Sequence, residues 1–143
     1  MNEEQWGSIG LWLNRLALFV VYGWFGVLKI VAISPANPLV ASLLEKTMPF
    51  LTFSQFIIGF GIFEVLIGFL FLIPRWEKVG LILLVIHLGT TIMPLFLLPA
   101  IAWQAPFVPT LEGQYIIKNI LIVACAWGVA ASTLGRRRSS FFW

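Results

Sequence analysis

The chain of 143 residues is 60% hydrophobic and only 10% charged. A water-soluble domain of this length needs far more polar residues to cover its core, so the composition excludes that class and predicts an integral membrane protein. The net charge of +3 does not indicate a nucleic-acid-binding protein, because the basic residues are scattered or flank apolar segments instead of forming a patch.

Four apolar segments are each long enough to cross the hydrocarbon core of a bilayer, which requires about 20 helical residues. They cover residues 9–33, 53–73, 79–98 and 113–134. We therefore expect an all-α fold, an integral membrane four-helix transmembrane bundle, in which residues 1–143 form a single domain. The lipid bilayer is the partner that this composition implies.

The connections between these segments differ in composition. In the first, Asn37 and Pro38 can cap and open a short amphipathic helix, which would lie along the membrane surface. The second, residues 74–78, is a tight turn. The third is rich in proline and aromatic residues, and we expect a stiff loop that acts as a lid through Trp103 and Phe107.

Basic residues are distributed unevenly between the two ends of the predicted bundle. The end that carries both termini holds Arg15, Arg75, Lys78, Arg136, Arg137 and Arg138. The opposite end holds only Lys46 among the connecting segments. Because cytoplasmic loops carry an excess of lysine and arginine, both termini are predicted to be cytoplasmic.

Each predicted helix carries a polar stripe, because residues three, four or seven positions apart share a face of an α-helix. The stripes consist of Arg15, Tyr22, Gly26 and Lys29; of Gly61, Glu64 and Gly68; of His87, Thr90, Thr91 and Pro94; and of Glu112, Tyr115, Lys118, Asn119 and Ile122. Lipid cannot satisfy such groups, so we expect the four stripes to face one another. The glycines beside Glu64 would let a neighbouring helix approach closely.

These stripes predict a ligand-binding or proton-relay site that opens to the non-cytoplasmic side. Its candidate residues are Lys29, Glu64, His87, Thr91, Tyr115, Lys118 and Asn119. With both lysines and Glu64 ionised and His87 neutral, the site would hold one surplus positive charge, which favours an anionic or electron-rich ligand. Glu64 and His87 would exchange a proton with that ligand. No metal site is predicted, since a lone histidine is more often a packing element.

Several of these side chains have an alternative role that needs no ligand. Lys29 would extend to the interface, Glu64 would be a protonated spacer, and Thr91 would bond back to its own helix. Cys125 is the only cysteine, which excludes an intramolecular disulfide and predicts a packing role.

Several sequence runs resemble a known family. They are Gly23-Trp24-Phe25-Gly26-Val27-Leu28-Lys29, Ser34-Pro35, Phe63-Glu64-Val65-Leu66-Ile67-Gly68, Thr91-Ile92-Met93-Pro94-Leu95 and Thr110-Leu111-Glu112-Gly113-Gln114-Tyr115-Ile116-Ile117-Lys118-Asn119. Together they resemble the YkgB-like membrane proteins of the DoxX-like superfamily, and more remotely the bundle of vitamin K epoxide reductases. We accordingly expect a multi-pass protein of the bacterial cytoplasmic (inner) membrane.

The resemblance implies a group linked to quinone-coupled sulfur oxidation, to resistance against reactive oxidants and, in distant relatives, to membrane-protein assembly. The thiol mechanism of vitamin K epoxide reductases does not transfer, because only Cys125 is present. Three functions stay open: binding of a quinone cofactor or a small oxyanion in a redox or oxidant-stress role, proton-coupled or anion transport, and membrane-protein assembly without a small ligand. Besides the bilayer, the partners that these functions call for are a small-molecule or anionic ligand, a second copy of the chain in a homo-oligomer, or a membrane redox partner.

Overall fold

The structure is a computed structural model that describes the backbone of residues 2–139 and the side chains of residues 2–132. Its long helices are α1 (Glu3–Ile30), α3 (Phe53–Leu72), α4 (Glu77–Ile92) and α7 (Leu111–Ser139). Among these described residues, four helical segments are long and apolar enough to cross a membrane, and the third of them extends α4 to Leu97. This confirms the predicted helical fold with four potential spans.

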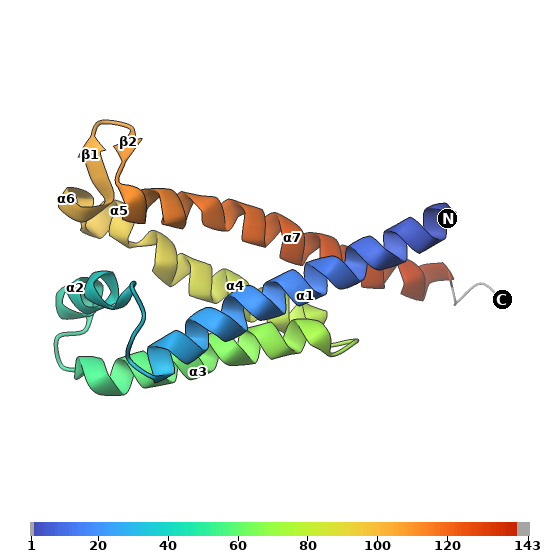
Figure 1. Cartoon of the computed structure of the whole chain (residues 1–143), viewed down its shortest axis with the longest axis horizontal. Coiled ribbons are helices and arrows are strands. Elements are labelled where there is room, and N and C mark those ends of the chain that lie inside the picture. Colours follow the sequence, from blue (N-terminus) through green and yellow to red (C-terminus); the bar gives the residue numbers. More distant parts are fainter. Residues whose placement is uncertain (1, 140–143) are drawn as a thin grey trace.

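The four long helices form a bundle in which each packs against two neighbours (Figure 1). Helix α1 lies against α3 and α7, and α4 lies against the same two helices from the other side. The start of α1 and the end of α7 lie at the same end of the bundle in Figure 1. This arrangement brings the polar stripes of α1, α3 and α4 within reach of one another.

The first helix begins earlier than the predicted residue 9. The Asn2 side chain accepts a hydrogen bond from the Gln5 backbone N–H, and the Gln5 side chain accepts one from the Asn2 backbone N–H. This reciprocal capping box satisfies free N–H groups of the first turn and fixes the helix start at Glu3.

The predicted short helix in the first connection is present as α2 (Asn37–Thr47), with Pro38 in its first turn. Its N-cap is Ala36 and not Asn37, so the predicted capping residue is wrong. The Asn37 side chain instead donates to the carbonyl of Ala32, 3.0 Å away, in the turn that follows α1. Helix α2 packs against α3 and α5, at the end of the bundle opposite the start of α1 (Figure 1).

The third connection has more structure than the predicted loop. It contains the one-turn helices α5 (Pro94–Leu97) and α6 (Pro99–Ala102) and an antiparallel hairpin of β1 (Trp103–Ala105) and β2 (Val108–Pro109). The hairpin projects from the end of the bundle beside the start of α7 (Figure 1). Such short strands carry no alternating pattern that a sequence could reveal.

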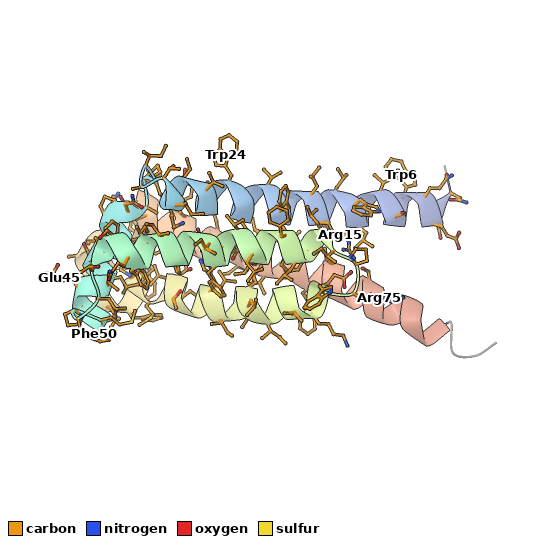
Figure 2. All side chains as sticks on the ribbon, turned by 90° about the horizontal axis from the view of Figure 1, so that it is seen from below. Trp6, Arg15, Trp24, Glu45, Phe50 and Arg75 are labelled. Atoms are coloured by element: carbon orange, nitrogen blue, oxygen red, sulfur yellow. The ribbon has the colours of Figure 1, made fainter. Side chains whose placement is uncertain are left out.

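The apolar core lies between the four long helices. Its buried members are Leu18, Tyr22, Ile67, Phe71, Leu84, Leu88, Ala126 and Val129, and Cys125 packs against them. Most other large apolar side chains point outward, as Figure 2 shows for Trp6 and Trp24. An outer surface of this kind is suited to lipid.

Candidate functional site

Lys29, Glu64 and His87 meet inside the bundle, although they come from three different helices. The Lys29 Nζ donates to both Glu64 carboxylate oxygens, at 2.9 and 2.7 Å. The His87 Nε2 lies 2.9 Å from Oε1 of the same carboxylate. The three residues are only 5%, 5% and 6% exposed, so each charge is compensated by a neighbour and not by water. Lys29 therefore does not extend to the interface.

The direction of the helices explains why Lys29 and Glu64 meet. Side chains on an α-helix lean toward the N-terminus of their own helix. Helices α1 and α3 run antiparallel (Figure 1), so Lys29 and Glu64 lean toward each other along the bundle axis. As predicted, Gly61 and Gly68 sit at close contacts with α1: a Cβ on Gly68 would lie 3.2 Å from the Gly23 nitrogen.

The second nitrogen of His87 faces two hydroxyl groups. Its Nδ1 lies 3.4 Å from the Tyr22 hydroxyl and 3.4 Å from Thr91 Oγ1. The Phe60 ring stacks on the imidazole with 5.0 Å between ring centres. Thr90 and Thr91 also donate to the His87 carbonyl, at 2.6 and 2.9 Å. The second bond confirms that Thr91 bonds back to its own helix, as predicted.

These contacts make a continuous chain of polar groups from Tyr22 through His87 and Glu64 to Lys29. In a neutral imidazole one nitrogen donates and the other accepts. If Glu64 is ionised, its carboxylate can only accept, so the tautomer that fits has the proton on Nε2 of His87 and leaves Nδ1 to accept from a hydroxyl. An imidazole that contacts one partner through each of its two nitrogens has the geometry that proton transfer requires.

The structure does not bring the predicted residues of α7 to this cluster. Lys118 is exposed, and its Nζ lies 5.0 Å from the centre of the Tyr115 ring, which is itself 61% exposed. Asn119 is half-buried. The prediction that four polar stripes face one another is therefore wrong for the fourth, because α7 turns apolar residues such as Ile116 and Ala126 inward.

The absence of Lys118 from the cluster changes the charge expected at the site. Lys29 and Glu64 contribute one positive and one negative charge, and a neutral His87 adds none. The predicted surplus of one positive charge depended on both lysines lying together, so it does not apply to the cluster in this structure.

The predicted lid residues lie in the β-hairpin and at its base. Phe107 is 94% exposed between the two strands, so it does not cover the cluster. Trp103 is half-buried, and its Nε1 donates to the carbonyl of Leu95 at 2.9 Å. This bond fastens the start of the hairpin to α5.

Comparison of the chain with models of protein families, with curated proteins and with solved structures finds no match. The resemblance to YkgB-like proteins therefore stays an expectation, and the functional conclusions rest on the geometry of the side chains. Within the part of the chain that the structure describes, no group of three His, Cys, Asp or Glu side chains is placed to hold a metal ion.

A second buried ion pair, which the sequence reasoning missed, joins Arg15 to Glu77. One guanidinium nitrogen of Arg15 donates to the Glu77 carboxylate, and the other donates to the carbonyl of Phe71 at 2.8 Å. Arg15 is 4% and Glu77 1% exposed. The signal that could have revealed it is that Arg15 belongs to the polar stripe of α1 and needs an acidic partner at its own depth.

Proposed function

We propose that this multi-pass membrane protein binds a quinone-class ligand beside the Lys29–Glu64–His87 cluster and exchanges a proton with it in a redox or oxidant-stress role. The observation that carries the proposal is the position of His87 between the Glu64 carboxylate, at 2.9 Å, and the Tyr22 hydroxyl, at 3.4 Å. Ionisable groups inside membrane spans are costly, and they mark relays and ligand sites.

Charge favours a quinone over an oxyanion. The cluster is neutral overall when Lys29 and Glu64 are both ionised, so it offers no net attraction to an anion. A neutral, lipid-soluble molecule loses little solvation when it leaves the bilayer for such a site. Reduction of a quinone to a quinol takes two electrons, from a membrane redox partner, and two protons. Protons taken up from water would pass through Glu64 and His87 to the carbonyl oxygens, and each group would return to its starting state.

The proposed setting is the bacterial cytoplasmic membrane with both termini in the cytoplasm. Aromatic rings beside the cluster support a planar ligand: Phe60 stacks on His87, and the centre of the Phe63 ring lies 6.2 Å from the same imidazole. Offset stacking of a quinone ring on such surfaces is favourable.

The proposal is tested by the thermal stability of the purified protein with short-chain ubiquinone and menaquinone analogues and, separately, with sulfate. A ligand at one hundred times its Kd stabilises the folded state by about 2.7 kcal/mol. We expect stabilisation by a quinone analogue only, and its loss in the Glu64→Gln variant. The matched control is Lys118→Gln, which removes a charge outside the cluster. No stabilisation by any quinone would contradict the proposal.

A small proton-coupled transporter is the second candidate. The series of polar side chains that runs from Tyr22 through His87 and Glu64 to Lys29 lies within the potential spans. This candidate predicts proton flux into proteoliposomes without any quinone, and loss of that flux in Glu64→Gln. Flux that survives this substitution would reject the route. Full cellular function of a Lys29→Met/Glu64→Gln variant would instead favour a role in assembly.

A further inference from the structure

The β-hairpin carries a phenylalanine at its tip that does not pack on the bundle. Phe107 is 94% exposed, and its neighbour Val108 is 49% exposed. The hairpin points sideways, away from the long axis of the bundle, beside the start of α7 (Figure 1). Phe107 therefore lies to the side of the bundle, at the end opposite the start of α1.

The backbone at this tip is strained as well. Ala105 and Val108 are paired, so Pro106 and Phe107 form a two-residue turn. Proline fixes φ at about −65°, whereas Phe107 has a φ of 62°. A turn in which φ is negative and then positive ordinarily has glycine at the second position, because a bulky side chain crowds the backbone there. The fold of the turn therefore gives no reason for a phenylalanine at this position.

The surface beside the hairpin is apolar and uncharged. The sequence between His87 and Glu112 contains no Asp, Glu, Lys or Arg. Phe96 is 75% exposed and Leu111 is 62% exposed, and both belong to potential spans. The outward apolar surface of these spans thus continues up to the hairpin. An uncharged connection of this kind, at the end of two spans, is suited to the membrane interface, where aromatic side chains are favoured.

The strands limit how deep the tip lies in the membrane. A two-stranded sheet leaves backbone N–H and C=O groups unpaired along its outer edges, and such groups are costly in hydrocarbon. The strands therefore belong at the level of the lipid headgroups, with the tip against the acyl chains. The base of the hairpin is held to the bundle: Trp103 donates to the Leu95 carbonyl at 2.9 Å, and Thr110 donates to the Ile101 carbonyl at 2.7 Å.

From these observations we infer that Phe107 inserts into the lipid leaflet on the side opposite the chain termini and anchors the hairpin there. Fully burying a phenylalanine side chain favours the inserted position by about 10- to 150-fold. The tip consists of Pro106, Phe107 and Val108, which offer no polar side chain to specify a protein partner. Through the base of the hairpin, the contact fixes the depth of the start of α7 in the bilayer. The inference is independent of the function proposed for the buried cluster.

The test places a nitroxide spin label at the tip and measures its collisions with oxygen, which concentrates in lipid, and with a water-soluble nickel chelate. The only cysteine is first removed by Cys125→Ala, so that Phe107→Cys carries the sole label. In phosphatidylcholine vesicles we expect this label to collide more with oxygen, like a label at Ile120→Cys on the exposed face of α7. Glu45→Cys is the matched control, because Glu45 is exposed and charged at the same end of the bundle (Figure 2). Its label should collide more with the nickel chelate.

A second variant separates anchoring from folding. Phe107→Gly removes the ring and gives the turn the residue that it favours, so its Tm in detergent should equal or exceed that of the wild type. A label at Ala105→Cys, an exposed position of β1, should nevertheless move toward water in this variant, and its oxygen-to-nickel collision ratio should fall several-fold. Phe107→Trp keeps an aromatic ring and should retain the ratio.

Three outcomes would overturn the inference. The first is a tip label that the nickel chelate reaches as readily as it reaches the label at Glu45→Cys. The second is a tip label shielded from both agents, as a protein partner would shield it. The third is an unchanged collision ratio in Phe107→Gly.

Discussion

Gly26 of α1 and Gly61 of α3 bring the two backbones into direct contact. A Cβ on Gly26 would lie 2.6 Å from the Gly61 carbonyl oxygen, and a Cβ on Gly61 would lie 2.6 Å from that of Gly26. Lys29 and Glu64 each follow one of these glycines by three positions. The contact therefore sets the separation of the helices at which the ion pair forms.

The substitution Gly61→Ala should destabilise the protein, although alanine is favoured over glycine in most helices by about 1 kcal/mol. The added methyl group has no room, and such overpacking costs about 1–3 kcal/mol. Thermal unfolding in detergent should show a lower Tm. Gly59→Ala is the matched control, since nothing lies within 4 Å of a Cβ at Gly59. Equal melting of the two variants would contradict the close contact.

Removing Lys29 should be far more costly than removing Lys118. Breaking a buried ion pair from one side leaves an uncompensated charge, which costs about 3–5 kcal/mol. We expect that loss in the free energy of unfolding of Lys29→Met, and a change within about 0.5 kcal/mol for Lys118→Met. The double variant Lys29→Met/Glu64→Gln should regain part of the loss. A double variant no more stable than Lys29→Met would argue against the pair.

Lysine should not replace Arg15. The guanidinium group serves the Glu77 carboxylate and the Phe71 carbonyl with two different nitrogens, and an ammonium group is a single point donor. Arg15→Lys should leave one buried acceptor unsatisfied, at a cost of about 1–3 kcal/mol. Amide hydrogen exchange should then be faster at the end of α3. Arg75→Lys, at an exposed position, is the control and should exchange like wild type.

The tautomer of His87 can be observed directly, because it is the only histidine. We expect 15N NMR of the neutral ring to show the proton on Nε2, toward Glu64. Tyr22→Phe removes a hydroxyl that faces Nδ1, so it should shift the Nδ1 resonance and leave the Nε2 resonance unchanged. The chain has one other tyrosine, so Tyr115→Phe is a matched control that should change nothing. A proton on Nδ1 would refute the proposed direction of the relay.

The sequence was sufficient to predict the four long helices and most of the buried cluster. Apolar segments of about 20 residues specify spans by length alone. The cost of an unpaired charge in lipid, combined with helical periodicity, indicated that Lys29, Glu64 and His87 share the interior. Glycines at close helix contacts followed from the same reasoning.

The sequence was not sufficient to predict which face of α7 turns inward. Its polar stripe and its small apolar residues offer two candidate faces, and packing in the assembled bundle selected the face with Ala126 and Val129. The pair of Arg15 and Glu77 was missed because Glu77 falls in a predicted turn, where an acidic residue is ordinarily solvated. The inward face of α7 and the Arg15–Glu77 pair both depend on how the helices pack against one another. Local periodicity in the sequence carries no information about that packing.

The two buried cations of α1 have a consequence for biosynthesis. Arg15 and Lys29 are ~21 Å apart along one helix, at 1.5 Å per residue. Their acidic partners belong to segments that are translated later. Glu64, the partner of Lys29, is in α3, and Glu77, the partner of Arg15, is at the start of α4. The first span thus emerges from the ribosome with two unneutralised charges. Lys29 gains its counter-ion when the second span is made, and Arg15 only when the third begins. Stable insertion of the opening segment therefore depends on the synthesis of two later spans.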